Sequence, residues 1–267
     1  MNFPPHLSVS GIAWRGHIQA AAREVASEVP VAFVYDGGTE AVMMATPADL
    51  EDFAVGFSLN ESVISAADDI TELAIVEMEQ GVELRVQLRA GLREMLVTRR
   101  RRKVGPVGCG LCGVESIADA LPPLPHVEAV LRLSPRELIA AMKEMRPLQE
   151  LNTRTQAVHA ASFYMPGRGI VALREDVGRH NALDKLAGAL ERARIAPATG
   201  AILMTSRVSV ELVQKAAMMG AGVLAAVSAP TALALRQAEE AGITIAGVVR
   251  DDGLEVFTHA ERIADAA

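Results

Sequence analysis

The stretch that decides the fold lies between residues 201 and 227 and reads AILMTSRVSVELVQKAAMMGAGVLAAV. Residues 201–205 and 222–227 are apolar runs of strand length, and residues 208–219 between them have the length of a helix. A strand, a helix of ten or more residues and a second strand predict a βαβ unit, in which the two strands are parallel.

The same alternation extends in both directions from this unit. The predicted strands are residues 161–165, 169–173, 201–205, 222–227, 243–249 and 254–257, and the predicted helices are residues 179–194, 208–219 and 231–241. Ser134 followed by Pro135 and Glu137 predicts another helix start, a capping box with proline in the first turn. The carboxyl-terminal half is therefore predicted to be an α/β domain with a mixed, largely parallel sheet.

The amino-terminal part has a different pattern, which predicts a smaller α+β unit. Its predicted strands are residues 29–35, 41–45, 73–78 and 82–88. Asp36-Gly37-Gly38 between the first two is typical of a hairpin turn, and Thr46-Pro47-Ala48-Asp49 predicts a helix start.

Proline residues between the two halves predict a hinge. Pro122-Pro123-Leu124-Pro125 ends any preceding helix, because proline cannot continue one. We therefore expect three parts: an amino-terminal part at residues 1–108, a cysteine loop with the hinge at 109–128, and the α/β domain at 129–267.

Composition and charge exclude several classes of protein. Half of the 267 residues are hydrophobic and 22% are charged, as in a globular chain that buries a full core. The net charge of −7 and the sequence pI near 5.5 argue against nucleic-acid binding. The amino terminus lacks the basic and apolar regions of a secretory signal, so we expect a cytoplasmic protein.

One uncharged run, residues 216–235, is long enough to cross a bilayer. It contains Gly220, Gly222, Ser228 and Pro230, which divide it into a helix end, a short strand and a new helix start. A buried strand between two helices explains the run better, and no membrane span is predicted.

The chain has two cysteines, Cys109 and Cys112, within GCGLCG at residues 108–113. Five basic residues, RRRRK at 99–103, precede them. Nearby cations favour the thiolate form of a cysteine, and the glycines leave sulfur atoms and backbone amides uncovered. The pattern favours a reactive thiol that acts on an anionic partner.

Three functions use a pair of cysteines at this spacing. A structural zinc site needs four ligands, so it would require two such pairs across a dimer. A thioredoxin-like redox site needs the pair at the first helix of a βαβ unit, whereas this pair follows a charged loop in mid-chain. The third function is a sulfur carrier, in which one cysteine holds a persulfide.

A second group of chemistry-bearing residues lies at the strand-to-helix junctions of the predicted α/β domain. EDVGRHNALDK at residues 175–185 is dense in charge, and Thr205-Ser206-Arg207 follows the next strand. Ser228-Ala229-Pro230-Thr231 and Arg250-Asp251-Asp252-Gly253 follow the two after that. Junctions at the carboxyl ends of parallel strands bind ligands, and hydroxyl and arginine groups beside helix N-termini suit phosphate.

These junctions predict an extended ligand with several phosphates, such as a nucleotide-bearing cofactor. No P-loop and no Gly-x-Gly-x-x-Gly motif is present, so binding of ordinary ATP or NAD is not indicated. A purely structural alternative is that Glu175 and Asp176 cap the helix while Arg179 and Lys185 pair with them in solvent. We favour the functional interpretation, because the charge density exceeds what capping needs.

Taken together, these motifs resemble the FdhD family, the formate dehydrogenase accessory sulfurtransferases. The matching stretches are GCGLCG at 108–113, VHAA at 158–161, EDVGRHNALDK at 175–185, TSR at 205–207 and VFTH at 256–259. One segment departs from the family, whose usual Thr-Gly-Gly before the histidine is Thr155-Gln156-Ala157 here.

The resemblance implies a sulfur carrier that accepts sulfur from a cysteine desulfurase as a persulfide on Cys109, with Cys112 assisting. The sulfur would be delivered to the molybdenum bis(molybdopterin guanine dinucleotide) cofactor before it enters formate dehydrogenase. The resemblance also implies a homodimer and a second half with the cytidine deaminase fold, and no intrinsic metal is predicted. The expected cofactor-binding residues are His159, Arg179, His180, Asn181, Thr205, Ser206, Arg207, Val248, Val249, Arg250, Asp251, Asp252 and Gly253.

Two rival functions can be compared with the sequence, and the first of them is not favoured. A zinc deaminase needs a His- or Cys-x-Glu motif and a downstream Pro-Cys-x-x-Cys, but His159-Ala160-Ala161 lacks the glutamate and the cysteine pair lies upstream. A chaperone that binds the cofactor without transferring sulfur would need the phosphate-binding junctions but not Cys109.

Overall fold

The computed structural model describes residues 3–92 and 121–264, and every structural statement below concerns these residues. The basic run at 99–103 and the motif with Cys109 and Cys112 lie outside them. Within the described residues the chain is a mixed α/β structure with three sheets, and no helix there is long and apolar enough to cross a membrane.

The carboxyl-terminal sheet has the strand order β12-β11-β10-β9-β7-β8. Its strands are β7 (His159–Met165), β8 (Gly169–Asp176), β9 (Ala201–Met204), β10 (Val223–Ala226), β11 (Thr244–Arg250) and β12 (Gly253–Val256). β9, β10 and β11 are parallel to one another, whereas β7 and β12 run antiparallel to their neighbours. Four of the six strands thus point the same way, although only two of the five pairings are parallel.

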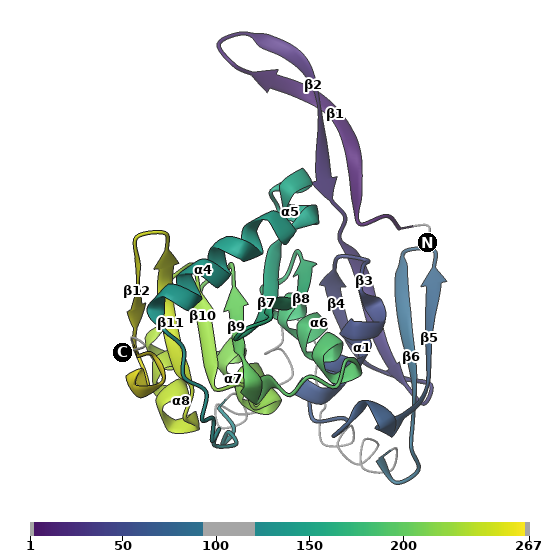
Figure 1. The fold of residues 1–267 in the computed structure, drawn as a ribbon. Coiled ribbons are helices and arrows are strands. Elements are labelled where there is room, and N and C mark those ends of the chain that lie inside the picture. The colour runs from purple at the N-terminus through teal and green to yellow at the C-terminus, as the bar shows by residue number, and fades with distance from the viewer. Residues whose placement is uncertain (1–2, 93–120, 265–267) are drawn as a thin grey trace.

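Helices cover both faces of this sheet (Figure 1). Helices α6 (Arg179–Arg192), α7 (Val210–Met219) and α8 (Ala232–Ala241) lie on one face, and α4 (Pro135–Met145) lies on the other. In β9, Ile202 and Met204 pack with the three helices, while Ala201 and Leu203 pack with α4. A strand buried on both faces has no polar side, which explains why residues 201–204 read AILM.

The predicted capping box and the predicted division of the uncharged run are both confirmed. Ser134 Oγ accepts a hydrogen bond from the Glu137 N–H at 3.2 Å, and the Glu137 carboxylate accepts one from the Ser134 N–H at 2.8 Å. Residues 216–235 form the end of α7, strand β10 and the start of α8. The remaining short helices are α5 (Glu150–Thr155) and the 3₁₀ turns Ala67–Asp69, Arg146–Leu148, Pro197–Thr199 and Ala260–Arg262.

The amino-terminal sheet has the order β4-β3-β6-β5 and packs against helix α1 (Leu50–Asn60). Its strands are β3 (Val29–Tyr35), β4 (Gly38–Ala45), β5 (Ile70–Met78) and β6 (Gly81–Leu88), which confirms the predicted elements. Phe33 from β3 stacks on Phe57 of α1 with ring centroids 3.9 Å apart, and Phe53 meets Phe33 edge-on at 4.9 Å. Most of the chain's few aromatic rings are therefore used in one small core.

Two glycines bring the halves of the molecule into backbone contact where α1 crosses α6. A Cβ atom on Gly56 would lie 1.7 Å from the Asp184 carbonyl oxygen, and one on Gly188 would lie 1.9 Å from the Asp52 carbonyl oxygen. No other residue type fits at either position unless the helices separate. The crossing therefore fixes where the first turn of α6 lies relative to the amino-terminal sheet.

A buried ion pair lies beside this crossing. Lys185 on α6 and Asp176 at the end of β8 have no exposed side-chain surface, and their charged atoms are 2.7 Å apart. Lys185 Nζ also donates to the Thr46 carbonyl at 2.9 Å, and the Thr46 N–H donates to Asp176 at 3.0 Å. The chain segment between β4 and α1 is thus tied to the junction between β8 and α6.

An amino-terminal hairpin forms a third sheet, for which the sequence analysis made no prediction. β1 (His6–Trp14) and β2 (Ile18–Ala26) pair over their whole length, and the hairpin projects away from the rest of the molecule (Figure 1). Gly16 occupies the turn with a φ of 83°, a conformation that glycine adopts without strain. The alternation was harder to recognise because most side chains here are small or polar and both faces are largely exposed.

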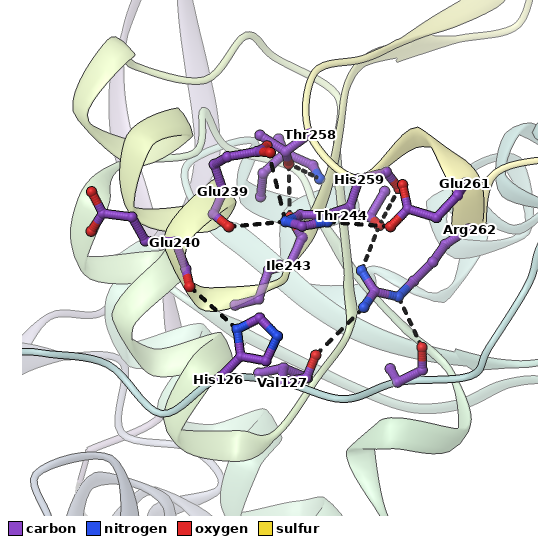
Figure 2. Close-up of polar contacts among 12 residues, drawn as sticks. His126, Val127, Glu239, Glu240, Ile243, Thr244, Thr258, His259, Glu261 and Arg262 are labelled. Atoms are coloured by element: carbon purple, nitrogen blue, oxygen red, sulfur yellow. Dashed lines mark hydrogen bonds and ion pairs between the residues drawn. The ribbon is translucent and has the colours of Figure 1, made fainter.

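The chain that precedes α4 is fastened at the amino ends of the parallel strands (Figure 2). Arg262 donates to the carbonyl oxygens of Val127 and Ala129 and to Thr244 Oγ1, at the first residue of β11. His126 and His259 contact the carbonyl oxygens of the last turn of α8. Residues 126–129 are therefore held at the amino edge of the six-stranded sheet.

Replacing Gly188 by Ala is expected to destabilise the protein by at least about 3 kcal/mol. At an interior helix position where the added Cβ meets no other atom, a change from glycine to alanine raises the free energy of unfolding by about 0.5–1 kcal/mol. Urea unfolding of the purified variant measures the difference. Gly11→Ala is the control, because a Cβ there meets nothing within 4 Å. A Gly188→Ala protein as stable as the control would contradict the proposed contact between α1 and α6.

Candidate functional site

The junctions selected from the sequence meet at one edge of the six-stranded sheet. β8, β9, β10 and β11 end there and β7 begins there, because His159 pairs with Asp176, and Met204 pairs with both Ala161 and Ala226. The Val248 N–H donates to the Ser228 carbonyl at 3.4 Å, which adds the end of β11. We call this the carboxyl edge, formed by His159, residues 176–180, residues 205–207, Ser228 and residues 248–253.

Thr205 fastens β9 to β7 at the carboxyl edge. Its Oγ1 accepts a hydrogen bond from the Ala160 N–H at 2.8 Å, and its own N–H donates to the Ala160 carbonyl at 3.1 Å. Ser206 is buried and its hydroxyl donates to the Arg207 carbonyl at 3.0 Å, while the Arg207 side chain is exposed. The two hydroxyls thus position the loop, and Arg207 places an exposed positive charge at this edge.

Two histidines at this edge are neutral near pH 7. Burial, followed by the charge of Arg179, lowers the pKa of His159 below its ordinary value. The same two causes lower the pKa of His180 to about 4. His180 Nε2 lies 3.3 Å from Ser209 Oγ and 3.7 Å from a carboxylate oxygen of Glu211. Because the histidines carry no charge, Arg179 supplies the positive charge at this junction.

Arg179 begins helix α6 and is suited to an anion. Its Nε is buried and has no hydrogen-bond partner among the described residues. A buried donor without a partner costs free energy, and a ligand oxygen would remove that cost. The N-terminus of the fourteen-residue helix α6 adds a partial positive charge at the same point. Phosphate or another anionic group therefore fits here.

Other members of the charged stretch have structural partners. Asn181 is buried, and its amide donates to the Met44 carbonyl and to Asp176, both at 2.9 Å. Glu175 accepts from the N–H groups of Leu151 and Asn152, so it caps α5 rather than α6. The structural alternative was therefore right that Lys185 pairs with Asp176, but wrong to place that pair in solvent. Binding of the cofactor by Asn181 remains a prediction.

Val248 has a strained backbone at the carboxyl edge. Its φ is 52°, which is unusual for a β-branched residue, and it lies where β11 bulges against β12. Strain of this kind is kept where surrounding structure holds it, and such positions are concentrated at binding sites. Arg250 beyond it is exposed, and Asp251 pairs with Arg146 at 2.9 Å. The implied binding segment from Val248 to Gly253, with Val249 and Asp252, thus contains one strained position and one exposed cation.

Ser209 and Glu211 also belong to this site, although no motif in the sequence singled them out. Both contact His180 from the start of α7, and Glu211 lies in the first turn of that helix. Ser209-Val210-Glu211 is typical of the start of a helix, because serine is a common N-cap residue and acidic residues favour the first turn. This helix start directly follows the Thr205-Ser206-Arg207 junction. Which junction such a start faces depends on how the strands are ordered, and the linear sequence does not show that.

The departure from the family's Thr-Gly-Gly has a visible consequence. Gln156 follows α5 with a φ of 55°, in the left-handed region where glycine is favoured. Its side-chain oxygen accepts a hydrogen bond from Arg23 of β2 at 3.3 Å. The substitution therefore links the foot of the hairpin to α5. Among the described residues, no group of three His, Cys, Asp or Glu side chains is placed to hold a metal ion.

Comparisons with known proteins agree with this architecture. The chain matches the sequence model of the FdhD/NarQ family over residues 26–264. It is 52% identical, over 90% of its length and 89% of the relative, to a protein named sulfur carrier protein FdhD from Agrobacterium fabrum. It is 46% identical to a protein of the same name from Cupriavidus necator, over 97% of this chain and 91% of that one.

A solved structure has the same fold. The crystal structure of a formate dehydrogenase accessory protein from Desulfotalea psychrophila matches with a TM-score of 0.75 at 26% identity, covering 98% of this chain and 100% of that one. The molecule thus has the mixed α/β fold of that protein. The chain belongs to the FdhD/NarQ family, which confirms the resemblance found in the sequence.

His180 is expected to make stability depend on pH below neutrality. Its folded-state pKa near 4 is below the unfolded value, so the unfolded chain binds a proton first as the pH falls. The free energy of unfolding should fall by about 2 kcal/mol between pH 7 and pH 4.5, and His180→Gln should remove most of this decline. Urea unfolding measures the slope. An NMR titration midpoint of the His180 ring near 6.5 would contradict the assignment.

Proposed function

We propose that this protein is a sulfur carrier that serves a formate dehydrogenase. In this proposal Cys109 accepts sulfur from a cysteine desulfurase as a persulfide, with Cys112 assisting. The sulfur is then delivered to the molybdenum bis(molybdopterin guanine dinucleotide) cofactor before the cofactor enters the enzyme. Family membership and the names of the relatives support the proposal. The observation that carries the cofactor part is the carboxyl edge with its arginines, where Arg179 Nε has no hydrogen-bond partner among the described residues.

The first step is a transfer between two sulfur atoms. The Cys109 thiolate attacks the terminal sulfur of the donor's persulfide, a new S–S bond forms, and the donor cysteine leaves as a thiolate. No electrons are gained or lost overall, so no further reactant is needed. The basic run at 99–103 favours the thiolate that this step requires.

The client cofactor is bulky and carries several phosphates, which is what the carboxyl edge is suited to hold. Arg179 at the start of α6, Arg207 after β9 and Arg250 at the end of β11 are spread along the edge rather than gathered at one point. Spaced cations suit a ligand with separated pyrophosphate groups. The neutral histidines beside Arg179 add hydrogen-bonding groups without further charge.

The described chain that follows the cysteine pair is fastened at one edge of the sheet, and the proposed cofactor contacts lie at the other. Residues 126–129 are fastened at the amino edge (Figure 2). The proposed cofactor contacts lie at the carboxyl edge. The four-residue strand β10 spans only about 13 Å between these edges. The seventeen positions from Cys109 to His126 can reach at most about 60 Å when extended, so the chain is long enough for the transfer.

The proposal includes features that rest on the resemblance. They are a cytoplasmic location, a desulfurase donor, a formate dehydrogenase client, a homodimer and a cytidine deaminase-like fold in the second half. A zinc bridge between cysteine pairs of two copies predicts instead one stoichiometric zinc ion per dimer and loss of the dimer with chelators.

Incubation with a cysteine desulfurase and free cysteine should add about 32 Da to the protein, the mass of one sulfur atom. Intact-mass spectrometry detects the adduct, and Cys109→Ala should lose it while still binding cofactor. Reduction with a thiol should remove it from the unchanged protein. If Cys109→Ala still supports full formate dehydrogenase activity in cells that lack the normal gene, the protein is a binding chaperone and the carrier function is wrong.

Guanosine diphosphate is a suitable probe for the carboxyl edge, because the cofactor contains guanine nucleotides. Arg179→Gln and Arg207→Gln should each weaken its binding by about tenfold or more, since each removes one charge-assisted hydrogen bond. Isothermal titration calorimetry measures the affinities. Arg168→Gln, in the turn between β7 and β8, lies at the opposite edge and should bind as the unchanged protein does. Equal losses in all three variants would contradict the placement.

A further inference from the structure

Ser209 lies directly before helix α7, at the position where a serine side chain usually caps a helix. Its side chain makes no capping hydrogen bond with the first turn. The buried hydroxyl is directed elsewhere, with Oγ 3.3 Å from Nε2 of His180. A serine at a capping position that does not cap the helix has another role, and the proposed sulfur transfer assigns none to it.

Glu211 determines which way the Ser209 hydroxyl points. Burial raises the pKa of Glu211, but hydrogen bonds from the Ser209 side chain and from its own backbone N–H, and then neighbouring positive charges, bring that pKa below its ordinary value. The carboxylate is therefore ionised near pH 7 and can only accept hydrogen bonds. Because the Ser209 proton points to Glu211, only lone pairs of Ser209 Oγ are left for His180.

The His180 ring must then donate its proton from Nε2. A neutral imidazole has one N–H group and one nitrogen without a proton, and His180 is neutral near pH 7 because burial and then Arg179 lower its pKa to about 4. A lone pair of Ser209 Oγ is matched only by a proton on Nε2. Oε2 of Glu211, which is buried and has no hydrogen-bond partner in the described ranges, lies 3.7 Å from Nε2 and attracts the same proton. Both neighbours favour the tautomer that has no proton on Nδ1.

Nδ1 of His180 is the ring nitrogen that remains for a ligand. It has no hydrogen-bond partner within residues 3–92 and 121–264. Solvent reaches it, because it is not one of the buried side-chain atoms that lack a partner there. The preceding residue is Arg179, whose buried Nε also lacks a partner in these ranges. Adjacent residues therefore present an uncharged acceptor and a charged donor at the carboxyl edge.

We infer that Glu211 and Ser209 are positioning residues, which hold the His180 ring with its proton on Nε2 so that Nδ1 accepts a hydrogen bond from an N–H or O–H group of the bound nucleotide. The inference rests on the proposed function, because it concerns the same cofactor site. It adds the kind of ligand group that lies against His180 and the two residues that select this group.

The tautomer decides which part of a nucleotide can lie against His180. An ionised phosphate oxygen only accepts hydrogen bonds, so a nitrogen without a proton repels it, whereas Arg179 attracts it. Ribose hydroxyls and the N–H groups of guanine can donate to such a nitrogen. A ring with its proton on Nδ1 would instead donate to phosphate. Glu211 and Ser209 therefore separate the phosphate contact at Arg179 from a sugar or base contact at His180.

The other charged groups near the ring support the same state. Arg179 and Lys215 both disfavour a second proton on His180, and only Glu211 favours one. Lys215 lies one turn after Glu211 on α7 and is held in place by Asp184, with 2.7 Å between their charged atoms. The ring therefore stays neutral while the neighbouring carboxylate stays ionised.

Long-range proton–nitrogen NMR correlation of the full chain with ¹⁵N-labelled histidine distinguishes a ring nitrogen with a proton from one without. The His180 signals are assigned by their loss in His180→Gln. In the unchanged protein at pH 7, we expect a single tautomer with the proton on Nε2. A proton on Nδ1 of His180 would overturn the inference.

Variants of Glu211 and Ser209 test what fixes this tautomer. In Glu211→Gln the amide can donate to Ser209 Oγ, so the hydroxyl can donate to His180 and both tautomers should be populated. Ser209→Ala should shift the populations in the same direction by a smaller amount, and Ser209→Thr, which keeps the hydroxyl, should not. Glu128→Gln is the matched control, because it removes the same charge from an exposed position at the amino edge. Tautomer populations that are the same in the unchanged protein, Glu211→Gln and Ser209→Ala would overturn the inference.

Nucleotide analogues identify the group that donates to Nδ1. Guanosine diphosphate is compared with its 2′,3′-dideoxy analogue, which lacks the ribose hydroxyls, and with purine riboside diphosphate, whose base lacks N–H groups. Calorimetry gives the affinities for the unchanged protein and for His180→Phe, which keeps a ring but has no nitrogen. At least one analogue should lose about fivefold more affinity in the unchanged protein than in His180→Phe, the equivalent of one hydrogen bond. Equal losses in the two proteins for both analogues would overturn the contact.

Failure of this inference is distinguishable from failure of the proposed function. The tautomer is measured in the free protein, without cofactor or sulfur donor. A proton on Nδ1 would leave the persulfide on Cys109 untouched. Absence of the sulfur adduct would contradict the carrier function and leave the tautomer as it is.

Discussion

The close crossing of α1 and α6 is the constraint on which the rest of the structure depends. At Gly56 and Gly188 the two helices touch through their backbones, and the geometry leaves no space for a side chain. The crossing joins the aromatic core around Phe33 and Phe57 to the six-stranded sheet. Because α6 starts at Arg179, the position of this crossing also sets where the cation and the neighbouring His180 lie.

Buried charges beside the crossing lock that position. Lys185 and Asp176 have no contact with solvent, and both also bond to the backbone of Thr46. A buried ion pair adds little net stability compared with apolar side chains of the same size. Separating its two charges is strongly destabilising, because each would then be buried without a partner. The pair therefore favours one arrangement of the two halves of the molecule. At the start of α6, six residues before Lys185, Arg179 has a buried nitrogen with no hydrogen-bond partner in the described part of the chain. On the same helix, the buried charge of Lys185 is paired with Asp176, whereas Arg179 at the start of the helix can bind a ligand.

The sequence predicted the alternating strands and helices of the six-stranded sheet well. It predicted the strand order, the contacts between side chains and the amino-terminal hairpin less well or not at all. Residues 201–204, AILM, had to be a strand buried on both faces, and Ser134-Pro135-Arg136-Glu137 had to start a helix, because these patterns depend only on nearby residues. The convergence of Thr205, Arg179 and Val248 at one edge followed from the polarity of parallel strands. The strand order, which places β7 between β8 and β9, and the contacts of Ser209 and Glu211 with His180 depend on tertiary packing, so the sequence did not show them. The hairpin at residues 6–26 was missed, because an arm that lies outside every core lacks the alternation of buried and exposed positions.

Hydrogen–deuterium exchange with and without guanosine diphosphate tests most directly the claim that the carboxyl edge binds the cofactor. We predict slower exchange at residues 176–181, 205–209 and 248–253, three stretches far apart in the sequence that this fold brings together. The hairpin at residues 6–26 should be unchanged when the protein concentration is held constant. Slower exchange at the amino edge around residues 126–129, with none at those three stretches, would contradict the account.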